Sequence, residues 1–155
     1  MEFPIRLTLD SEYRNDYNLV VDTVRSQDDI AALRNLRSDE NMDSMTYVDT
    51  ALEDDDPIYL VRESGTDDVV AMLTMRLEPS RSHLLSIFVS PEWEGVGVGY
   101  TLTKFAVTLR PTTYLYVATV NERAIGVYTG VGFTKCHVCP MFDTEGDALL
   151  MEYTS

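Results

Sequence analysis

Basic residues are scarce in this 155-residue chain, and lysine is almost absent. The chain has 12 Lys and Arg against 26 Asp and Glu, a formal net charge of −14, and its only lysines are Lys104 and Lys135. Such a chain has no basic patch to neutralise phosphates, so neither nucleic acid nor an anionic membrane surface is an expected partner. Scarce lysine with abundant aspartate is typical of proteins from salt-loving organisms, and an ordinary acidic protein is the alternative.

Long apolar runs are also missing. None approaches the roughly 18 residues that would span a bilayer, and the first residues lack the continuous apolar segment of a signal peptide. These absences predict a cytoplasmic protein. Hydrophobic residues nevertheless make up 45% of the chain, which at this length predicts one globular domain with a substantial core.

Cysteine is limited to one short stretch, Cys136-His137-Val138-Cys139. A zinc site usually needs four ligands, and a redox Cys-x-x-Cys pair usually opens a helix. This stretch instead has a strand-like pattern that follows Phe133. We therefore predict neither a metal site nor a redox role for the pair.

The remaining patterns predict strands and helices that follow a polar N-terminal arm. In the arm, residues 1–17, only Ile5, Leu7 and Leu9 alternate. The arm is expected to add an edge strand or to pack on a partner, which leaves a homodimer open, and residues 18–155 are predicted to form the single domain. Strands are expected at 20–24, 57–62, 69–77, 83–89, 114–120, 133–138 and 148–153, and helices at 26–36, 98–109 and 121–131.

This order of elements is that of an α+β domain with a mixed sheet and helices on both faces. Two helix starts have clear capping residues, Ser26 and Asn121. Two acidic segments have no predicted regular structure, residues 38–56 and the loop 141–147.

Three glycines alternate in one loop of the chain. The stretch reads Ser90-Pro91-Glu92-Trp93-Glu94-Gly95-Val96-Gly97-Val98-Gly99-Tyr100. A glycine loop between an apolar strand and an amphipathic helix is typical of a backbone that wraps around a phosphate. A P-loop is excluded because no lysine follows these glycines, and a dinucleotide fingerprint is excluded because its third glycine is missing.

The loop resembles the acetyl-CoA signature of the GNAT family of N-acetyltransferases, Gln/Arg-x-x-Gly-x-Gly/Ala. The match runs from Glu94 to Gly99, with glutamate in the place of Gln/Arg. A second stretch is similar to the family's Asn, helix, Tyr, Gly-Phe pattern, and two motifs in the right order are more specific than one. That stretch is Asn121-x-x-Ala124-x-x-x-Tyr128-x-x-x-Gly132-Phe133.

The resemblance covers the whole chain except residues 1–17, and it implies the family's fold. That fold is a central twisted mixed sheet of about six or seven strands with helices on both faces. Strands 4 and 5 of the family, which correspond to residues 83–89 and 114–120, are splayed apart.

The resemblance also implies acetyl-CoA as the co-substrate. Its pyrophosphate would be held by backbone N–H groups of the loop and by the N-terminus of the next helix, so an acidic loop can still hold an anion. Lys104 and Arg123 are candidate partners of the 3′-phosphate. The residues assigned to coenzyme binding are Ile87, Phe88, Val89, Gly95, Val96, Gly97, Val98, Gly99, Tyr100, Asn121 and Arg123.

Two residues are predicted to act in catalysis. The resemblance implies that Tyr128 protonates the departing thiolate, and a purely structural core tyrosine is the alternative. Some relatives carry a glutamate base where this chain has Tyr116, and others carry it on the preceding strand, where the count gives His83. An ordinary histidine titrates near pH ~6.5 and suits the role, although a solvated His83 and transfer without a base both stay open.

We therefore expect an N-acetyltransferase that moves an acetyl group from acetyl-CoA to a primary amine by direct attack in a ternary complex. The acceptor is expected to contact segments 38–56 and 141–147, whose acidity favours a cationic amine. Because the strand glutamate is missing, a non-catalytic acyl-CoA-binding or regulatory module with the same fold is the alternative.

Overall fold

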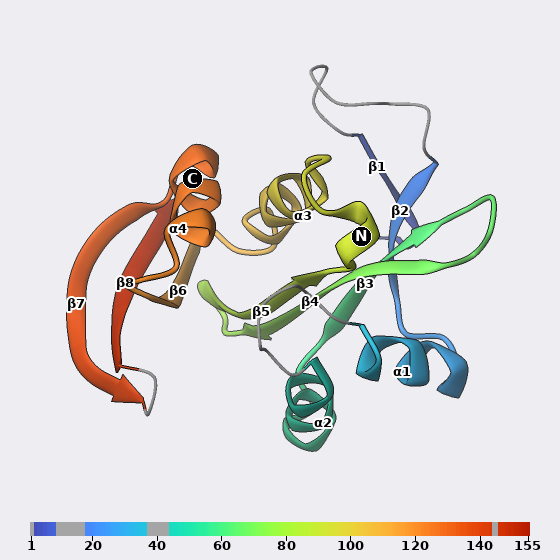
Figure 1. Cartoon of the computed structure of the whole chain (residues 1–155), viewed down its shortest axis with the longest axis horizontal. Helices are drawn as coiled ribbons and strands as arrows, with labels where there is room; N and C mark the ends of the chain where they lie inside the picture. Colours follow the sequence, from blue (N-terminus) through green and yellow to red (C-terminus); the bar gives the residue numbers. More distant parts are fainter. Residues whose placement is uncertain (1, 9–17, 37–43, 144–145) are drawn as a thin grey trace.

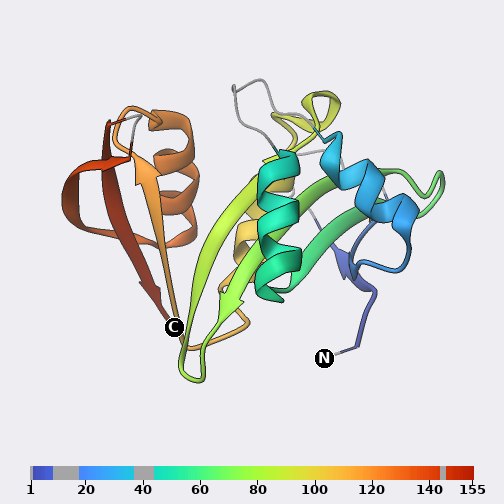
Figure 2. The same cartoon turned by 90° about the horizontal axis from the view of Figure 1, so that it is seen from below.

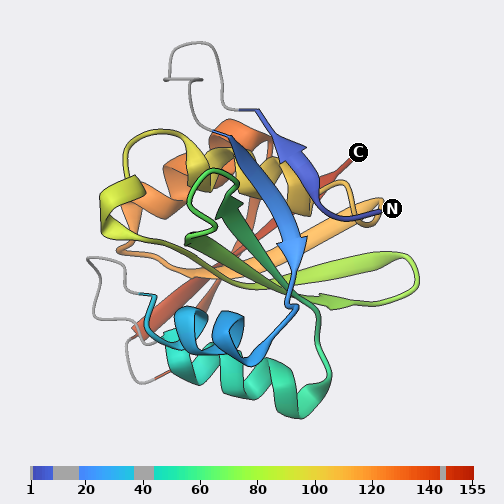
Figure 3. The ribbon, with the colours of Figure 1, turned by 90° about the vertical axis from the view of Figure 1, so that its right-hand side faces the viewer.

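The computed structural model describes residues 2–8, 18–36, 44–143 and 146–155, and within them one sheet lies between two pairs of helices (Figure 3). The strand order is β1-β2-β3-β4-β5-β6-β8-β7, and among the described strands only the β5–β6 pair is parallel. The predicted mixed sheet with helices on both faces is confirmed, with eight strands in place of six or seven. The strands are β1 (Ile5–Leu7), β2 (Leu19–Thr23), β3 (Ile58–Glu63), β4 (Val69–Leu77), β5 (Arg81–Val89), β6 (Thr112–Ala118), β7 (Thr134–Asp143) and β8 (Gly146–Thr154).

One face of the sheet is covered by α1 (Gln27–Arg34) and α2 (Ser44–Asp54). The hydroxyl of Ser26 accepts a hydrogen bond from the Asp29 N–H, as its capping role predicts. The expectation that residues 38–56 lack regular structure is wrong, because α2 occupies most of that range. Its buried positions, Ser44, Val48 and Ala51, recur at helical spacing and pack against the sheet despite the acidic residues between them.

The opposite face carries α3 (Val98–Ala106) and α4 (Glu122–Val131), which lie side by side (Figure 1). Leu102 and Ala106 of α3 are fully buried in the larger of two core clusters. The side chain of Asn121 accepts from the Ala124 N–H and caps α4. Gly132 ends α4 with a φ of 125°, a left-handed conformation that favours glycine. No helix in the described ranges is long and apolar enough to cross a membrane.

The C-terminal hairpin is longer than the sequence predicts. The stretch 141–147 was expected to be a loop, but β7 runs to Asp143 and β8 starts at Gly146, and these two residues still pair. The loop prediction is therefore wrong for most of the stretch. The predicted strand ended where the apolar alternation ends, but backbone pairing continues beyond that point. At the other edge, β1 pairs antiparallel with β2, and residues 9–17 of the arm lie outside the described residues.

A buried ion cluster fastens α1 to the sheet. The guanidinium of Arg62 on β3 donates two hydrogen bonds of 3.0 Å to the carboxylate of Asp29 on α1. Its Nε lies 3.8 Å from the Asp22 carboxylate on β2. All three residues are at most 6% exposed, so removal of the cation would leave two buried carboxylates without it.

We predict that Arg62→Met destabilises the fold by about 3–5 kcal/mol, measured as the free energy of unfolding in urea. The matched control is Arg34→Met, which breaks the exposed Arg34–Asp49 pair and should cost less than about 1 kcal/mol. Because the hydrogen bonds from Arg62 lower the pKa of Asp29, the contribution is present above the ordinary aspartate pKa and is lost as pH falls below it. Equal losses in the two variants would contradict the account.

Candidate active site

The central feature of the site is a gap between two strands that begin as neighbours. Parallel pairing of β5 with β6 covers only Arg81–Thr112, Ser82–Thr113 and His83–Tyr114. Beyond that point the two strands diverge (Figure 2), and among the described residues the remainder of β5 has no strand partner on its β6 side. The splayed strands that the sequence predicts are thus present, with unpaired backbone groups along the gap.

A bulge in β5 sits beside this gap. The register with β4 shifts between Thr74–Ser86 and Met75–Leu84, which leaves one extra residue in β5. The Phe88 ring points into the α1/α2 side, where it lies 5.5 Å from the Tyr47 ring. Only the backbone of Phe88 can therefore contact a coenzyme in the gap, whereas Ile87 and Val89 pack towards the α3 side.

The glycine loop joins β5 to α3 and ends at an unusual helix start. Gly95 and Gly97 have φ values of 78° and 90°, in the left-handed region. The N-cap of α3 is Gly97, which offers no side-chain acceptor, whereas α1 and α4 are capped by Ser26 and Asn121. No cap side chain therefore competes with an external anion for the first-turn N–H groups of α3, which fits a phosphate group there.

Gly99 differs from the two glycines before it. Its φ is not in the left-handed region, and a Cβ added there would lie 3.6 Å from Val89 Cγ2, an ordinary contact. The fold alone therefore does not require glycine at position 99, although a bound coenzyme could.

The two basic candidates for phosphate binding lie at different places. The Arg123 guanidinium in the first turn of α4 lies 3.7 Å from the Glu94 carboxylate in the glycine loop, so the pair links the loop to α4. The Lys104 ammonium lies 5.5 Å from the centre of the Tyr100 ring. Arg123 is thus at the loop, with its charge already offset by Glu94.

Tyr128 lies on α4 within the larger core and is 7% exposed. Burial raises the pKa of Tyr128 to about 12, so the phenol stays protonated at neutral pH. In a proton transfer it can therefore give a proton but cannot act as the base. The Tyr100 hydroxyl donates to the Gly130 carbonyl at 3.4 Å, which connects α4 to the first turn of α3. The structure therefore brings the helix of Tyr128 next to the glycine loop.

His83 and Tyr116, the two alternative positions for a base, are neighbours. Their rings lie 5.7 Å apart, and His83 also stacks on Tyr114 at 4.5 Å. His83 pairs with Arg76, which contacts Asp54 of α2, so these rings lie on the α1/α2 side of the sheet. Burial and the nearby Arg76 lower the pKa of His83. The histidine is therefore neutral at pH 7 and able to accept a proton.

Sequence reasoning missed Tyr114 and Phe142, which join this group of rings. Tyr116 stacks on Phe142 at 4.7 Å. Phe142 was expected to lie in a loop, but it belongs to the longer β7, and its ring reaches Tyr116 of β6 across β8. Alternating tyrosines at 114 and 116 were a usable signal, because strand residues two apart share a face.

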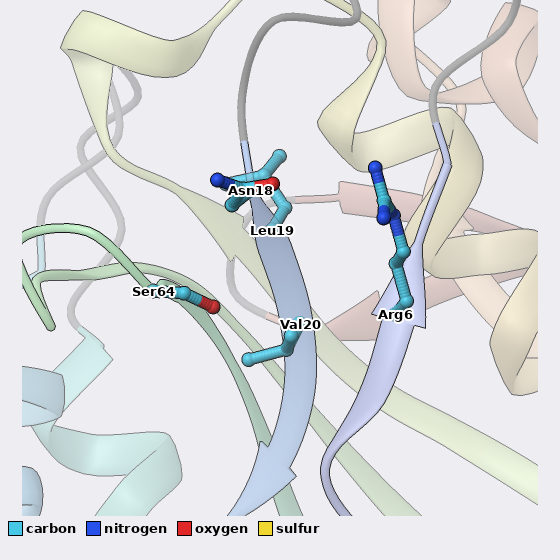
Figure 4. Close-up of a pocket in the computed structure, with 5 residues that line it drawn as sticks. All are labelled: Arg6, Asn18, Leu19, Val20 and Ser64. Atoms are coloured by element: carbon cyan, nitrogen blue, oxygen red, sulfur yellow. The ribbon is translucent and has the colours of Figure 1, made fainter.

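Two further features lie away from this site. A hollow of about 180 Å³ at the β1–β2 edge (Figure 4) contains none of the predicted site residues, and it is lined by Arg6, Asn18, Leu19, Val20 and Ser64. Cys136 and Cys139 are free thiols in β7. Within the described part of the chain, no group of three or more His, Cys, Asp or Glu side chains could hold a metal ion.

Comparison with known proteins defines the family. The model of the acetyltransferase (GNAT) family matches residues 24–133, which is more than two thirds of the chain and contains both glycine loop and Tyr128. The chain belongs to the acetyltransferase (GNAT) family.

One curated relative is similar to part of the chain, and two solved structures share its fold. Peptidyl-lysine N-acetyltransferase YjaB of Escherichia coli (strain K12) is 37% identical over 54 residues, 35% of this chain and 37% of that protein. The match thus spans little more than a third of the relative's length. The ribosomal-protein-S18-alanine N-acetyltransferase of Escherichia coli aligns with a TM-score of 0.71 and 17% identity, over 88% of this chain and 93% of that one. The NatC complex bound to Gag peptide and CoA aligns with a TM-score of 0.67 and 16% identity, over 88% of this chain and 98% of that one.

We predict that Gly97→Ala and Gly99→Ala differ in stability. Alanine at 97 must adopt the left-handed conformation and should cost about 1 kcal/mol or more, whereas alanine at 99 should leave the melting temperature nearly unchanged. If the coenzyme's pyrophosphate lies against this turn, both variants should bind acetyl-CoA more weakly in calorimetric titrations. Normal affinity in Gly99→Ala would show that the backbone at 99 does not approach the ligand closely.

We predict that acetyl transfer depends on the protonation of His83. Because its pKa is lowered, kcat/KM calculated for the neutral form of the amine should stay constant from pH 8 down to about 6.5 and fall only below that value. The measurement is a pH–rate profile of wild type and His83→Ala. A His83→Ala profile with the same acidic limb as wild type would remove His83 from the reaction.

Proposed function

We propose that the chain is an N-acetyltransferase that moves an acetyl group from acetyl-CoA to a primary amine by direct attack in a ternary complex. The observation that carries this proposal is the meeting of the β5–β6 gap with the α3 N-terminus, which has no capping side chain. Backbone donors there suit the pyrophosphate, and the unpaired edge of β5 suits the amides of the pantetheine arm. Ile87, Phe88 and Val89 would contribute through their backbone.

The residues on the two sides of the sheet supply the proton transfers in this proposal. His83, on the α1/α2 side, takes the proton that the amine loses as the new C–N bond forms, directly or through a water. Tyr128, on the α3/α4 side, gives its proton to the sulfur as the C–S bond breaks. Its raised pKa keeps the phenol protonated at neutral pH, so a proton is available at the sulfur.

The acceptor in this proposal is a cationic amine. The formal net charge of −14 attracts cations and repels anionic acceptors at low ionic strength. A cytoplasmic location belongs to the same proposal, because acetyl-CoA must be supplied to the site.

We predict that Tyr128→Phe lowers kcat by about 10²-fold or more and leaves acetyl-CoA affinity within about two-fold. The change removes only the hydroxyl, so the ring keeps its contact with Phe133, 5.7 Å away. Turnover is followed as release of free CoA thiol with a panel of amines, and affinity by calorimetry.

The matched control is Tyr153→Phe, whose ring also lies 5.7 Å from that of Phe133 and which should keep full activity. Unchanged turnover in Tyr128→Phe would remove this residue from the mechanism. Coenzyme binding without transfer to any amine in the panel would favour the non-catalytic acyl-CoA-binding module instead.

A further inference from the structure

Four rings from three strands form a continuous surface, which we call the aromatic platform: His83, Tyr114, Tyr116 and Phe142. His83 stacks on Tyr114 at 4.5 Å and meets Tyr116 edge-on at 5.7 Å, and Tyr116 stacks on Phe142 at 4.7 Å. The platform begins where β5 and β6 separate and extends to the β7–β8 hairpin. It therefore borders the proposed reaction site.

The platform is open to solvent on one side. The helices α1 and α2 lie over β3, β4 and β5, whereas none of the four described helices lies in front of β6, β8 and β7 when this face is viewed (Figure 2). Tyr116 is 37% exposed and Phe142 is 49% exposed. Large aromatic side chains that stay exposed together are typical of a binding surface.

The charges around the platform favour a cation. The Tyr114 hydroxyl donates to the Glu78 carboxylate at 3.3 Å, and Arg81 lies 3.2 Å from the same carboxylate. Arg76 is held by Asp54 and Asp56. Both nearby arginines are thus engaged by carboxylates of the chain.

Glu152 adds a carboxylate to the same face. It lies directly opposite Tyr114 in the β6–β8 pairing, and residues opposite each other in an antiparallel pair share a face. No described basic side chain forms an ion pair with it. His137 lies opposite Leu150 on the adjoining strand.

Aromatic faces beside carboxylates attract organic cations. The chain itself contains an instance, because the Arg81 guanidinium lies 4.7 Å from the centre of the Tyr114 ring. The more exposed rings, Tyr116 and Phe142, are left for a ligand. The reacting amine, however, must be neutral when it attacks, so the amine that is acetylated is not the group that this surface holds.

We propose that the aromatic platform binds a second ammonium group of the acceptor, so that the enzyme prefers diamines or polyamines to monoamines. This inference rests on the proposed acetyl transfer. One amine reaches the gap between β5 and β6, while a protonated amine further along the same molecule lies against Tyr116 and Phe142 near Glu152. Platform residues thereby determine specificity without taking part in bond formation.

The test compares α,ω-diaminoalkanes of three to eight carbons with alkyl monoamines of equal length. At low ionic strength, kcat/KM should be about 3- to 30-fold higher for the best diamine than for its matched monoamine. Phe142→Ala and Glu152→Gln should each reduce this ratio towards one, mainly by raising KM for the diamine. Neither should change kcat/KM for the monoamine.

The matched controls are Phe142→Tyr, which keeps the ring and should keep the preference, and Val138→Ala. Val138 is on the same strand and is also 49% exposed, but no ring contact involves it among the described residues. Calorimetric titration of the diamine into the CoA-loaded protein gives a readout without turnover. It should detect binding that Phe142→Ala weakens and Val138→Ala does not.

Equal kcat/KM for diamines and monoamines, or equal ratios in Phe142→Ala and Val138→Ala, would overturn the inference while transfer itself stands. A lysine-containing peptide that surpasses every diamine and loses its advantage in Phe142→Ala would assign the platform to a peptide instead. If acetyl-CoA gives no binding heat at all, the proposed function fails, and this inference fails with it.

Discussion

The proposed site depends on one structural constraint, the early end of pairing between β5 and β6. Parallel strands that separate after three residue pairs leave backbone groups that the sheet cannot satisfy, and such groups need another partner or water. Core packing fixes the two strands on either side of the gap, because Phe88 of β5 packs with α1 and α2 in one cluster, whereas residues of β4, β5, β6 and β8 share the other cluster with α3 and α4. The gap is therefore a fixed property of the fold: β5 and β6 separate beyond His83, and the glycine loop follows the end of β5.

The same constraint explains how an acidic chain can hold an anionic coenzyme. In the proposed function, the donors in the gap and at the α3 N-terminus would be backbone groups, and the left-handed turns at Gly95 and Gly97 lead the chain into that helix. Their hydrogen bonds act at short range and are screened little by salt. The carboxylates of the chain lie near other groups. Glu94 offsets Arg123, and others surround the rings at the base of the gap, where a cationic acceptor would gain from them.

The sequence was most informative where local patterns carry the structure. The caps at Ser26 and Asn121 and the β3–β4 hairpin could be predicted, because capping and alternation depend on nearby residues. The splayed strands were expected only from the resemblance to the GNAT family. The helix α2 was missed, since its burial rests on Ser44, Val48 and Ala51, too weak an apolar pattern to stand out in an acidic segment. The extent of β7 was missed because strand pairing, not side-chain pattern, prolongs it. As a result, no sequence argument could place Phe142 beside Tyr116 or reveal the aromatic platform, which exists only through contacts between distant segments.

The most direct measurement is a calorimetric titration of acetyl-CoA into the wild-type protein at low and at molar KCl. Backbone recognition in the gap predicts binding with one site per chain at both salt concentrations, with an affinity that changes by less than about ten-fold between them, because few charged side chains contribute. The absence of binding at both concentrations would contradict the account, since it would mean that the gap and the glycine loop keep the shape of the family site without its ligand.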